Sequence, residues 1–143
     1  MVDDAKVILP HRSRYARTQR TATAVTLRVG ERRIRVYSTH LGTVADISGA
    51  QRRAQLATIL ADARMNDAVL VGGDMNTSDL AEVARLFRHA WPTERIGATT
   101  GFGAWDHLLV RGLCEAAPCG AGVAREGFSA SDHAAIWVEI PMR

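Results

Sequence analysis

Residues 24–40 contain two stretches in which apolar and polar side chains alternate, residues 24–29 and residues 32–40. The apolar positions are Val25, Leu27 and Val29 in the first stretch, and Ile34 and Val36 in the second. Such alternation predicts two β-strands, each with its apolar side chains on one face. Gly30-Glu31 separates them, and a Gly-X pair between two strands is typical of a hairpin with a type II′ turn.

A helical pattern follows at residues 49–65. Ser48 and Gln51 have the spacing of a capping box, in which Ser48 caps the helix and Gln51 bonds back to it. The small and apolar residues at helical spacing are Ala50, Ala54, Ala57, Leu60 and Ala63, flanked by Leu56 and Ile59. A second helix is predicted from Ser78-Asp79, with acidic residues in its first turn, to shortly before Trp91-Pro92.

Three further stretches predict strands. Residues 67–72 form a short apolar run typical of a strand covered on both faces, and the other strands are residues 107–110 and 134–140. Loops are expected at the glycine-rich residues 97–103 and 112–127. Without a repeat or a linker, the pattern predicts a single α/β domain over residues 1–143, with a mixed β-sheet and helices on one face.

The composition is that of a globular protein, with 47% hydrophobic and 23% charged residues and no apolar run long enough to span a bilayer. Lys6 is the only lysine, and this bias toward arginine is typical of a GC-rich bacterial genome. Four arginines lie in the basic strip from Arg12 to Arg20. This strip either attracts phosphate groups or forms a solvated loop, and the sequence leaves both open.

The two cysteines, Cys114 and Cys119, do not have the spacing of a zinc site. Pairing across a loop is one option if the protein is exported, and the sequence leaves the redox state of both cysteines open. Residues 1–6 do not resemble a signal peptide. The sequence leaves both a cytoplasmic and a secreted location open.

Short polar segments lie at the boundaries of the predicted strands. They are Ser38-Thr39-His40, Gly73-Asp74-Met75-Asn76, Trp105-Asp106-His107 and Ser131-Asp132-His133. Ligands of α/β proteins bind at strand ends, where loops present side chains that the core would not tolerate. We therefore expect these four segments to form one site.

The side chains of these segments suit the attack of water on a phosphodiester. Asp74 and Asp132 are hard ligands for a divalent ion such as Mg²⁺ or Mn²⁺, and Asn76 offers an amide for water or a phosphoryl oxygen. The other candidates are His40 as a donor to an anionic oxygen, Asp106 as the carboxylate that orients an imidazole, and His133 as a proton-exchanging group.

Each segment also has a purely structural explanation when it is taken alone. A histidine beside a strand is usually structural, and Asp-x-Asn is common in turns because both side chains bond to nearby backbone. His11 and His89 have no partner in the pattern, and we expect both at the surface. The recurrence of four polar segments at strand ends is what favours a functional site.

The order of these segments resembles the second half of the endonuclease/exonuclease/phosphatase superfamily, which has the DNase-I-like fold. That half has a hairpin ending in Thr-His-Leu, a helix carrying Arg and Gln, a strand ending in Gly-Asp-Phe-Asn, an Asp-His or Asp-Tyr strand and a closing Ser-Asp-His. This sequence has Thr39-His40-Leu41, then Arg52 and Gln55, then Gly73–Asn76, Asp106-His107 and Ser131–His133, with Arg20 where the family often has an arginine before the hairpin.

The resemblance implies a role for each residue. Asp74 and Asn76 would position the attacking water and the phosphoryl group, and strand alternation would turn both to one side while Met75 points into the core. His133 would be the catalytic histidine, supported by Asp106. The residues implied in binding are His40, Asn76 and Arg20 for the substrate, and Asp74 with Asp132 for the metal.

The family's first half has strands bearing an Asn and a metal-binding Glu, and neither has a counterpart in this sequence. The family domain is a four-layer sandwich of two similar sheets. The resemblance therefore implies a partial, C-terminal half-domain with an exposed apolar sheet face. Three arrangements stay open: the chain is a fragment, it forms a homodimer, or a separate N-terminal half covers the face.

The sequence thus predicts a divalent-metal-dependent hydrolase of phosphate esters, with nucleic acid as the leading substrate because the basic strip suits a polyanion. Phospholipid headgroups and inositol phosphates stay open, since a fold does not fix a substrate. Two other hypotheses remain. One is a catalytically incompetent half-domain that binds a partner chain or nucleic acid. The other is a transition-metal hydrolase with His40 and His133 as ligands.

Overall fold

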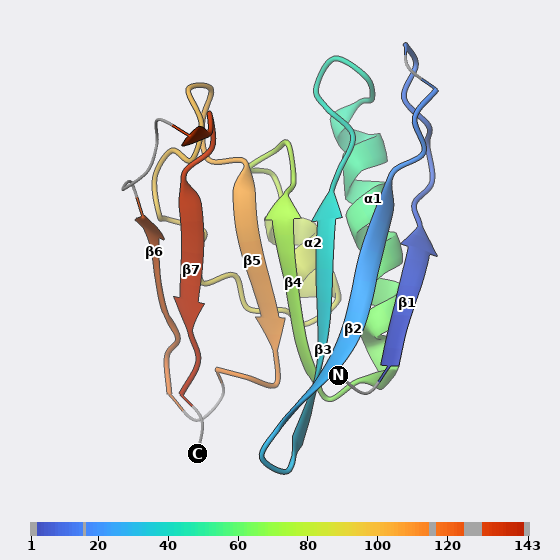
Figure 1. Cartoon of the computed structure of the whole chain (residues 1–143). Helices are drawn as coiled ribbons and strands as arrows, with labels where there is room; N and C mark the ends of the chain where they lie inside the picture. The colour runs from blue at the N-terminus through green and yellow to red at the C-terminus, as the bar shows by residue number, and fades with distance from the viewer. Residues whose placement is uncertain (1–2, 16, 115–116, 125–129, 142–143) are drawn as a thin grey trace.

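A computed structural model describes residues 3–15, 17–114, 117–124 and 130–141 (Figure 1). Its strands are β1 (Asp3–Ile8), β2 (Thr21–Val29), β3 (Arg32–His40), β4 (Ala68–Asp74), β5 (Asp106–Arg111), β6 (Gly120–Ala124) and β7 (Ala135–Glu139). Its helices are α1 (Gly49–Asp62), the 3₁₀ turn η1 (Ala63–Met65) and α2 (Ala81–Leu86). None of the helices in this part of the chain is both long and apolar enough to cross a membrane.

Strands β1 to β5 form one five-stranded sheet in the order of the sequence. Strands β3 and β4 are parallel, and the other neighbours in this sheet are antiparallel. Strands β6 and β7 form a separate two-stranded sheet, and β7 lies beside β5 (Figure 1). The predicted α/β class with a mixed sheet is therefore confirmed, and both α-helices cover the same face of the larger sheet (Figure 1).

The core lies between this face and helix α1. Its fully buried side chains include Leu56, Ile59 and Leu60 from the helix and Val69 and Val71 from β4. Burying a side chain of this kind stabilises the fold by about 1.5–3 kcal/mol. The buried stripe of α1 contains Arg52, Gln55, Leu56, Ile59 and Leu60. The predicted alanine stripe is displaced from this line, because Ala50 is exposed and Ala54 and Ala57 are only half-buried.

The opposite face of the sheet carries the alternating side chains of the hairpin β2–β3. Cross-strand pairing places Val25 opposite Val36 and Leu27 opposite Ile34, so the two predicted apolar rows lie on one face. Leu27 is 38% exposed and Val29 is 43% exposed. We call this surface the open face. It is apolar and only partly covered within the described residues.

The turn of the hairpin is the two-residue Gly30-Glu31 connection that the sequence predicts, because Val29 pairs with Arg32. Gly30 has φ 60°, which a type II′ turn requires at its first central position, whereas Glu31 has no positive φ. The capping box is confirmed as well, since the Ser48 side chain accepts from the Gln51 backbone and the Gln51 side chain accepts from the Ser48 backbone.

Three details differ from the sequence-based expectations. Helix α2 is shorter than predicted, because Arg88 adopts a left-handed φ of 57° just after it. His89 is not a surface residue: it is only 6% exposed, and its Nδ1 lies 2.9 Å from the Phe87 carbonyl oxygen. Strand β6 lies in the glycine-rich segment 112–127 that we expected to be a loop; residues 115–116 and 125–127 of that segment lie outside the described residues.

Cys114 and Cys119 form a disulfide, with their Cα atoms 5.3 Å apart. The bond joins the segment after β5 to the residue before β6. The structure thus pairs two cysteines whose redox state the sequence left open. A cross-link of this kind restricts the unfolded chain, although a short closed loop gains less than a long one.

Candidate active site

The parallel pairing of β3 and β4 brings the first two candidate residues together. His40 is the last residue of β3 and pairs in register with Asp74, the last residue of β4. His40 Nε2 lies 3.3 Å from Asp74 Oδ2. The next strand, β5, runs antiparallel to β4 and begins with Asp106 opposite Asp74. Three strand termini therefore place His40, Asp74 and Asp106 together at one end of the sheet.

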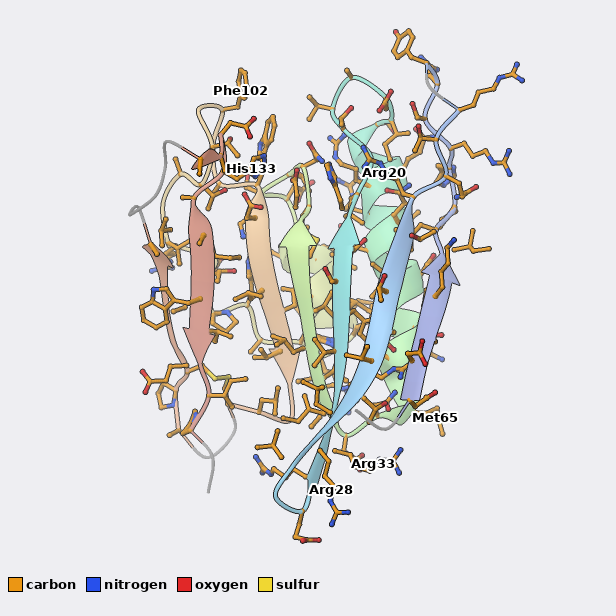
Figure 2. The ribbon with its side chains drawn as sticks, viewed as in Figure 1. Arg20, Arg28, Arg33, Met65, Phe102 and His133 are labelled. Carbon is orange, nitrogen blue, oxygen red and sulfur yellow. A yellow bond between two sulfur atoms is a disulfide. The ribbon has the colours of Figure 1, made fainter. Side chains whose placement is uncertain are left out.

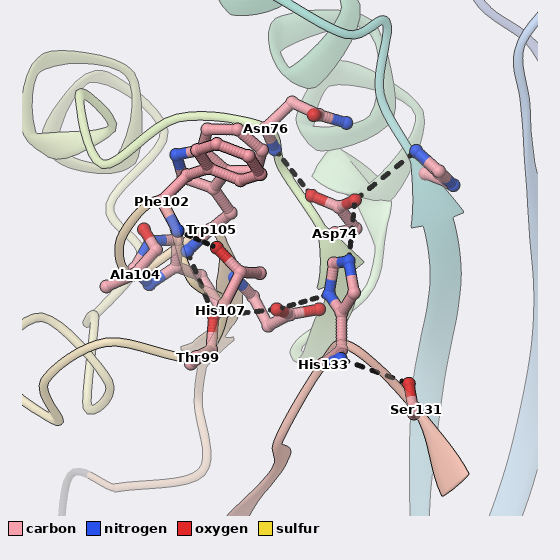
Figure 3. Close-up of polar contacts among 12 residues, drawn as sticks. Asp74, Asn76, Thr99, Phe102, Ala104, Trp105, His107, Ser131 and His133 are labelled. Carbon is pink, nitrogen blue, oxygen red and sulfur yellow. Dashed lines mark hydrogen bonds and ion pairs between the residues drawn. The ribbon is translucent and has the colours of Figure 1, made fainter. Parts of the chain in front are cut away.

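His133 completes this cluster from the segment before β7 (Figure 3). Its Nδ1 lies 2.8 Å from Asp106 Oδ2, and its Nε2 lies 4.0 Å from Asp74 Oδ2. The backbone N–H of His133 donates to the Ser131 hydroxyl at 3.0 Å. The imidazole is thus held by one carboxylate at one nitrogen and faces a second carboxylate with the other. This is the arrangement of a carboxylate–histidine dyad.

Thr99 is a residue of this site that the sequence analysis did not identify. It is fully buried, and its hydroxyl donates to Asp106 Oδ2 at 2.7 Å, the same oxygen that contacts His133. Its carbonyl oxygen accepts from the Ala134 backbone N–H at 2.8 Å. Thr99 therefore ties Asp106 to the segment that carries His133. In the sequence it is one threonine in a polar loop, with nothing to distinguish it from Thr100.

Asn76 lies beside the cluster, but not as strand alternation suggests. Strand β4 ends at Asp74, and Asn76 adopts a left-handed φ of 50°, so the two-residue repeat of a strand does not extend to it. Its backbone N–H donates to Asp74 Oδ1 at 2.8 Å, and its side-chain amide donates to the Leu41 carbonyl at 3.1 Å. Asn76 thus orients Asp74 and is 3% exposed. Met75 is fully buried in the core, as predicted.

Gly73 explains why β3 and β4 approach so closely at this end of the sheet. It has φ 140°, and a Cβ atom at this position would lie 1.8 Å from the Thr39 carbonyl oxygen. Only glycine fits such a backbone contact. The close approach keeps the adjacent residues His40 and Asp74 in register. The glycine of the Gly-Asp-Met-Asn segment therefore has a local structural cause.

Two buried side chains of helix α1 hold the loops around the site. The Gln55 amide donates to the Pro10 carbonyl at 2.8 Å, and its oxygen accepts from the Gly42 N–H at 2.9 Å. Arg52 donates to the Ile47 carbonyl at 2.8 Å. The Arg and Gln in the predicted helix therefore fix the loop that follows His40, and they do not reach into the cluster themselves.

The two site histidines have pKa values shifted in opposite directions. The hydrogen bond to Asp106 is the largest cause that raises the pKa of His133, and Asp74 and Asp132 raise it further through their charges. Partial burial is the largest cause that lowers the pKa of His40, followed by the positive charge of Arg20. The surroundings of His133 therefore stabilise its imidazolium form relative to an unperturbed histidine, and those of His40 destabilise it.

Arg20 precedes β2 at the same end of the sheet as His133 (Figure 2). Its Nε is buried and has no hydrogen-bond partner within the described residues. The residue as a whole is half-buried, and its positive charge contributes to the lowered pKa of His40. This position is compatible with the predicted contact between Arg20 and substrate.

Asp132 is exposed, and its carboxylate acts on His133 through its charge. Within the described ranges, no group of three or more His, Cys, Asp or Glu residues is arranged to hold a metal ion. Mg²⁺ rarely needs such a cage, because it takes one or two carboxylates and completes its shell with water and substrate oxygens. Asp74 and Asp132 remain the predicted carboxylate ligands.

Comparison with known proteins identifies the family and the fold of this chain. Residues 5–133 match the model of the endonuclease/exonuclease/phosphatase family. No curated protein matches the sequence. Solved structures with the same fold include a functionally unknown conserved protein from Enterococcus faecalis V583, with 18% identity and a TM-score of 0.75 over 99% of this chain and 66% of that one.

Two further structures share the fold. TDP2 from D. rerio, complexed with a single-strand DNA product, has 13% identity and a TM-score of 0.69 over 99% of this chain and 68% of that one. Sphingomyelinase C from Streptomyces griseocarneus has 18% identity and a TM-score of 0.70 over 96% of this chain and 60% of that one. This chain thus spans about two thirds of the length of such structures. It belongs to the endonuclease/exonuclease/phosphatase family.

Proposed function

We propose that this chain carries the catalytic residues of a divalent-metal-dependent hydrolase of phosphate esters, with nucleic acid as its leading substrate. Members of the family are hydrolases that act on phosphate esters. The observation that carries the proposal is the convergence of His40, Asp74, Asp106 and His133 at one end of the sheet. These side chains come from four separate segments, and their contacts leave two imidazole Nε2 atoms facing one carboxylate oxygen.

The proposed mechanism assigns a task to each side chain. Asp106 holds Nδ1 of His133, so that Nε2 is directed toward the reacting groups and exchanges a proton there. Asp74, itself fixed by the Asn76 backbone, orients the attacking water. His40 and Arg20 donate hydrogen bonds to the phosphoryl oxygens. Bound at Asp74 and Asp132, a divalent ion would neutralise the charge that develops on the phosphoryl group.

Electrostatics supports the need for a cation. Asp74, Asp106 and Asp132 all act on His133 through their charges, so the site already holds three carboxylates. A phosphate ester adds a further negative charge to the same small volume. Like charges repel, and within the described residues Arg20 and a protonated His133 offset only part of this negative charge. A divalent ion would therefore favour substrate binding as well as hydrolysis.

Nucleic acid is the substrate class that the charge distribution favours. Arg12 and Arg14 are exposed on the loop that leads to Arg20, so the basic strip extends outward from the site. Such a strip binds successive phosphates of one strand. The related TDP2 structure holds a single-strand DNA product. The relationship to sphingomyelinase C keeps phospholipid headgroups as the alternative substrate.

A second proposal concerns the open face, which we expect to be covered by a second copy of this chain or by an N-terminal half of the domain, either in the same protein or separately encoded. This face has a cavity of about 280 Å³ between β3, β4, β5 and the segment 134–136. Its apolar lining includes Val36, Leu70 and Leu108. Light scattering distinguishes the two: a concentration-dependent dimer supports the second copy, whereas a stable monomer at all concentrations contradicts the second copy and favours an N-terminal half.

Hydrolysis of bis(p-nitrophenyl) phosphate during a Mg²⁺ or Mn²⁺ titration tests the catalytic proposal. We expect activity that EDTA abolishes and that His133→Ala lowers by about 10²- to 10⁴-fold, the usual contribution of a general acid or base. His11→Ala is the matched control, because His11 is exposed and its side chain contacts Gln51. Activity unchanged in His133→Ala contradicts the mechanism.

Failure of the wild-type chain to hydrolyse this ester or an oligonucleotide supports the non-catalytic alternative, a half-domain that binds a partner chain or nucleic acid. The zinc hypothesis is tested in the same titration. Activity that Zn²⁺ restores after chelation, and Mg²⁺ does not, would assign His40 and His133 to the metal. Restoration by Mg²⁺ alone supports the two carboxylates as ligands.

A further inference from the structure

Phe102 is the most unusual side chain near the candidate site. It is 85% exposed and lies at the tip of the loop between α2 and β5. It projects at the same end of the molecule as His133 and Arg20 (Figure 2). A single exposed apolar residue needs no explanation by itself. The argument for a role rests on how this ring is held.

The Phe102 ring stacks on the indole of Trp105. Their centroids are 5.5 Å apart, and the ring planes differ by only 13° (Figure 3). A near-parallel pair of this kind stabilises the ring orientation. One face of Phe102 is occupied by Trp105, and its high exposure leaves the other face free. The pair therefore presents a flat aromatic surface to solvent.

This surface is connected directly to the site. The Trp105 carbonyl accepts from the backbone N–H of Met75, which lies between Asp74 and Asn76, at 2.7 Å. The Trp105 backbone N–H donates to the Thr99 hydroxyl at 3.0 Å. That hydroxyl also bonds to Asp106. Trp105 is thus bonded on both sides to segments that carry the candidate catalytic carboxylates.

The loop that carries Phe102 is ordered by its own hydrogen bonds. The Thr100 hydroxyl accepts from the backbone N–H groups of Phe102 and Gly103, at 3.1 and 3.2 Å. The backbone N–H groups of Thr99 and Thr100 both donate to the Gly103 carbonyl at 3.0 Å. The position of the ring is therefore set before a ligand arrives, which reduces the entropy lost on binding.

We propose that the Phe102–Trp105 pair is a stacking platform for the nucleobase adjacent to the phosphate held by the site. The inference rests on the proposed function and narrows its substrate class to phosphate esters that carry a planar aromatic group. Stacking does not distinguish strongly between bases, because each base has a π-face. The platform would therefore place a strand end in the site and leave the sequence largely unread.

The geometry favours a base over a lipid. Insertion into a membrane depends on the apolar area that is buried, and Phe102 is the one large hydrophobic side chain of residues 97–105 that is exposed. The pair instead offers one free planar face beside a site lined by charges. The basic strip supplies contacts for further phosphates of the same strand, as single-stranded nucleic acid binding requires. These features together match a nucleotide.

Binding of a fluorescent oligothymidylate, measured by anisotropy in EDTA, tests the platform without turnover. The comparison probe has the same backbone with tetrahydrofuran residues in place of the bases, so its charge is equal. We expect Phe102→Ala to weaken binding of the base-bearing probe by about 5- to 150-fold and to leave the base-free probe unchanged. Phe102→Tyr should restore the higher affinity for the base-bearing probe over the base-free probe. Leu86→Ala, at another exposed apolar side chain, is the control.

Three results overturn the inference: equal affinity of the wild type for both probes, equal loss for both probes in Phe102→Ala, or failure of Phe102→Tyr to restore binding.

Sedimentation with phosphatidylcholine–phosphatidylserine vesicles tests the rival hypothesis that Phe102 contacts a membrane. Phe102-dependent vesicle binding without base-dependent oligonucleotide binding assigns the ring to a membrane instead. Base-dependent binding by a chain that hydrolyses no ester keeps the platform and rejects the proposed hydrolysis. Hydrolysis of esters without base-dependent binding keeps the proposed function and rejects the platform.

Discussion

At one end of the five-stranded sheet, polar side chains contact one another, whereas at the other end they extend into solvent (Figure 2). The side chains of Asp74 and Asp106 are only 13% and 15% exposed, and both contact histidines. At the hairpin end, Arg28 lies 3.5 Å from Glu31, with side chains 63% and 95% exposed. Similar charged groups thus have very different surroundings.

The difference shows which charged side chains are held in place at a cost in folding free energy. An exposed ion pair such as that of Arg28 and Glu31 contributes about 0–1 kcal/mol and constrains little. Partly buried carboxylates must be desolvated, and they remain charged only if partners are held in place. Asp106 has two such partners on one oxygen, Thr99 and His133. Arrangements of this kind are characteristic of functional sites, where pKa values are also displaced.

Neutralising one carboxylate at each end tests this contrast most strongly. We expect Asp106→Asn to lower kcat for bis(p-nitrophenyl) phosphate by about 10²- to 10⁴-fold, because the imidazole of His133 loses its orienting carboxylate. Glu31→Gln should leave kcat unchanged, since Glu31 is almost fully exposed. Steady-state rates with Mg²⁺ measure both. Similar rates for the two variants would remove the distinction between the ends of the sheet.

Removing one arginine at each end should have a smaller effect. Arg20→Ala should raise KM for an oligonucleotide about tenfold, because it removes a charge-assisted bond to phosphate. The slope of log KM against log salt should fall in magnitude by about one, the change for one lost phosphate contact. Arg28→Ala should change neither. An equal salt slope in wild type and Arg20→Ala would place Arg20 outside the substrate-binding surface.

The sequence predicted the elements whose cause is local. The hairpin faces follow from alternation, the start of α1 from its capping box, and buried β4 from a continuous apolar run. The four polar segments stood out because each adjoins a strand end. That three of them meet follows from strand pairing, since the parallel register of β3 and β4 aligns His40 with Asp74.

The features that the sequence did not predict depend on tertiary contacts. Thr99 acquires its role only because the loop folds over Asp106 and accepts from Ala134. His89 becomes buried through packing after α2, and no local pattern encodes that. Strand β4 ends at Asp74 and Asn76 is left-handed, so alternation stops two positions before the residue for which it was predicted. Periodicity describes elements and does not describe the segments between them.

The smallest expected effect is on the titration of the two site histidines. NMR of the metal-free protein should show the pKa of His133 above 6.5, raised by its hydrogen bond to Asp106, and the pKa of His40 below 6.5, lowered by partial burial. Asp106→Asn should lower the pKa of His133, because it removes the largest cause of the increase. An unchanged pKa in this variant would contradict the dyad.

The same shifts fix the sign of the pH dependence of stability. Because the folded pKa of His133 is raised, its contribution to the free energy of unfolding is complete below pH 6.5 and is lost as the pH rises through the raised pKa. His40 acts oppositely, since its lowered pKa costs stability as the pH falls below 6.5. Urea unfolding above pH 6.5 should therefore show a decline in wild type that flattens in Asp106→Asn and persists in Glu31→Gln. An equal decline in all three proteins would mean that Asp106 and His133 are not coupled in the folded chain.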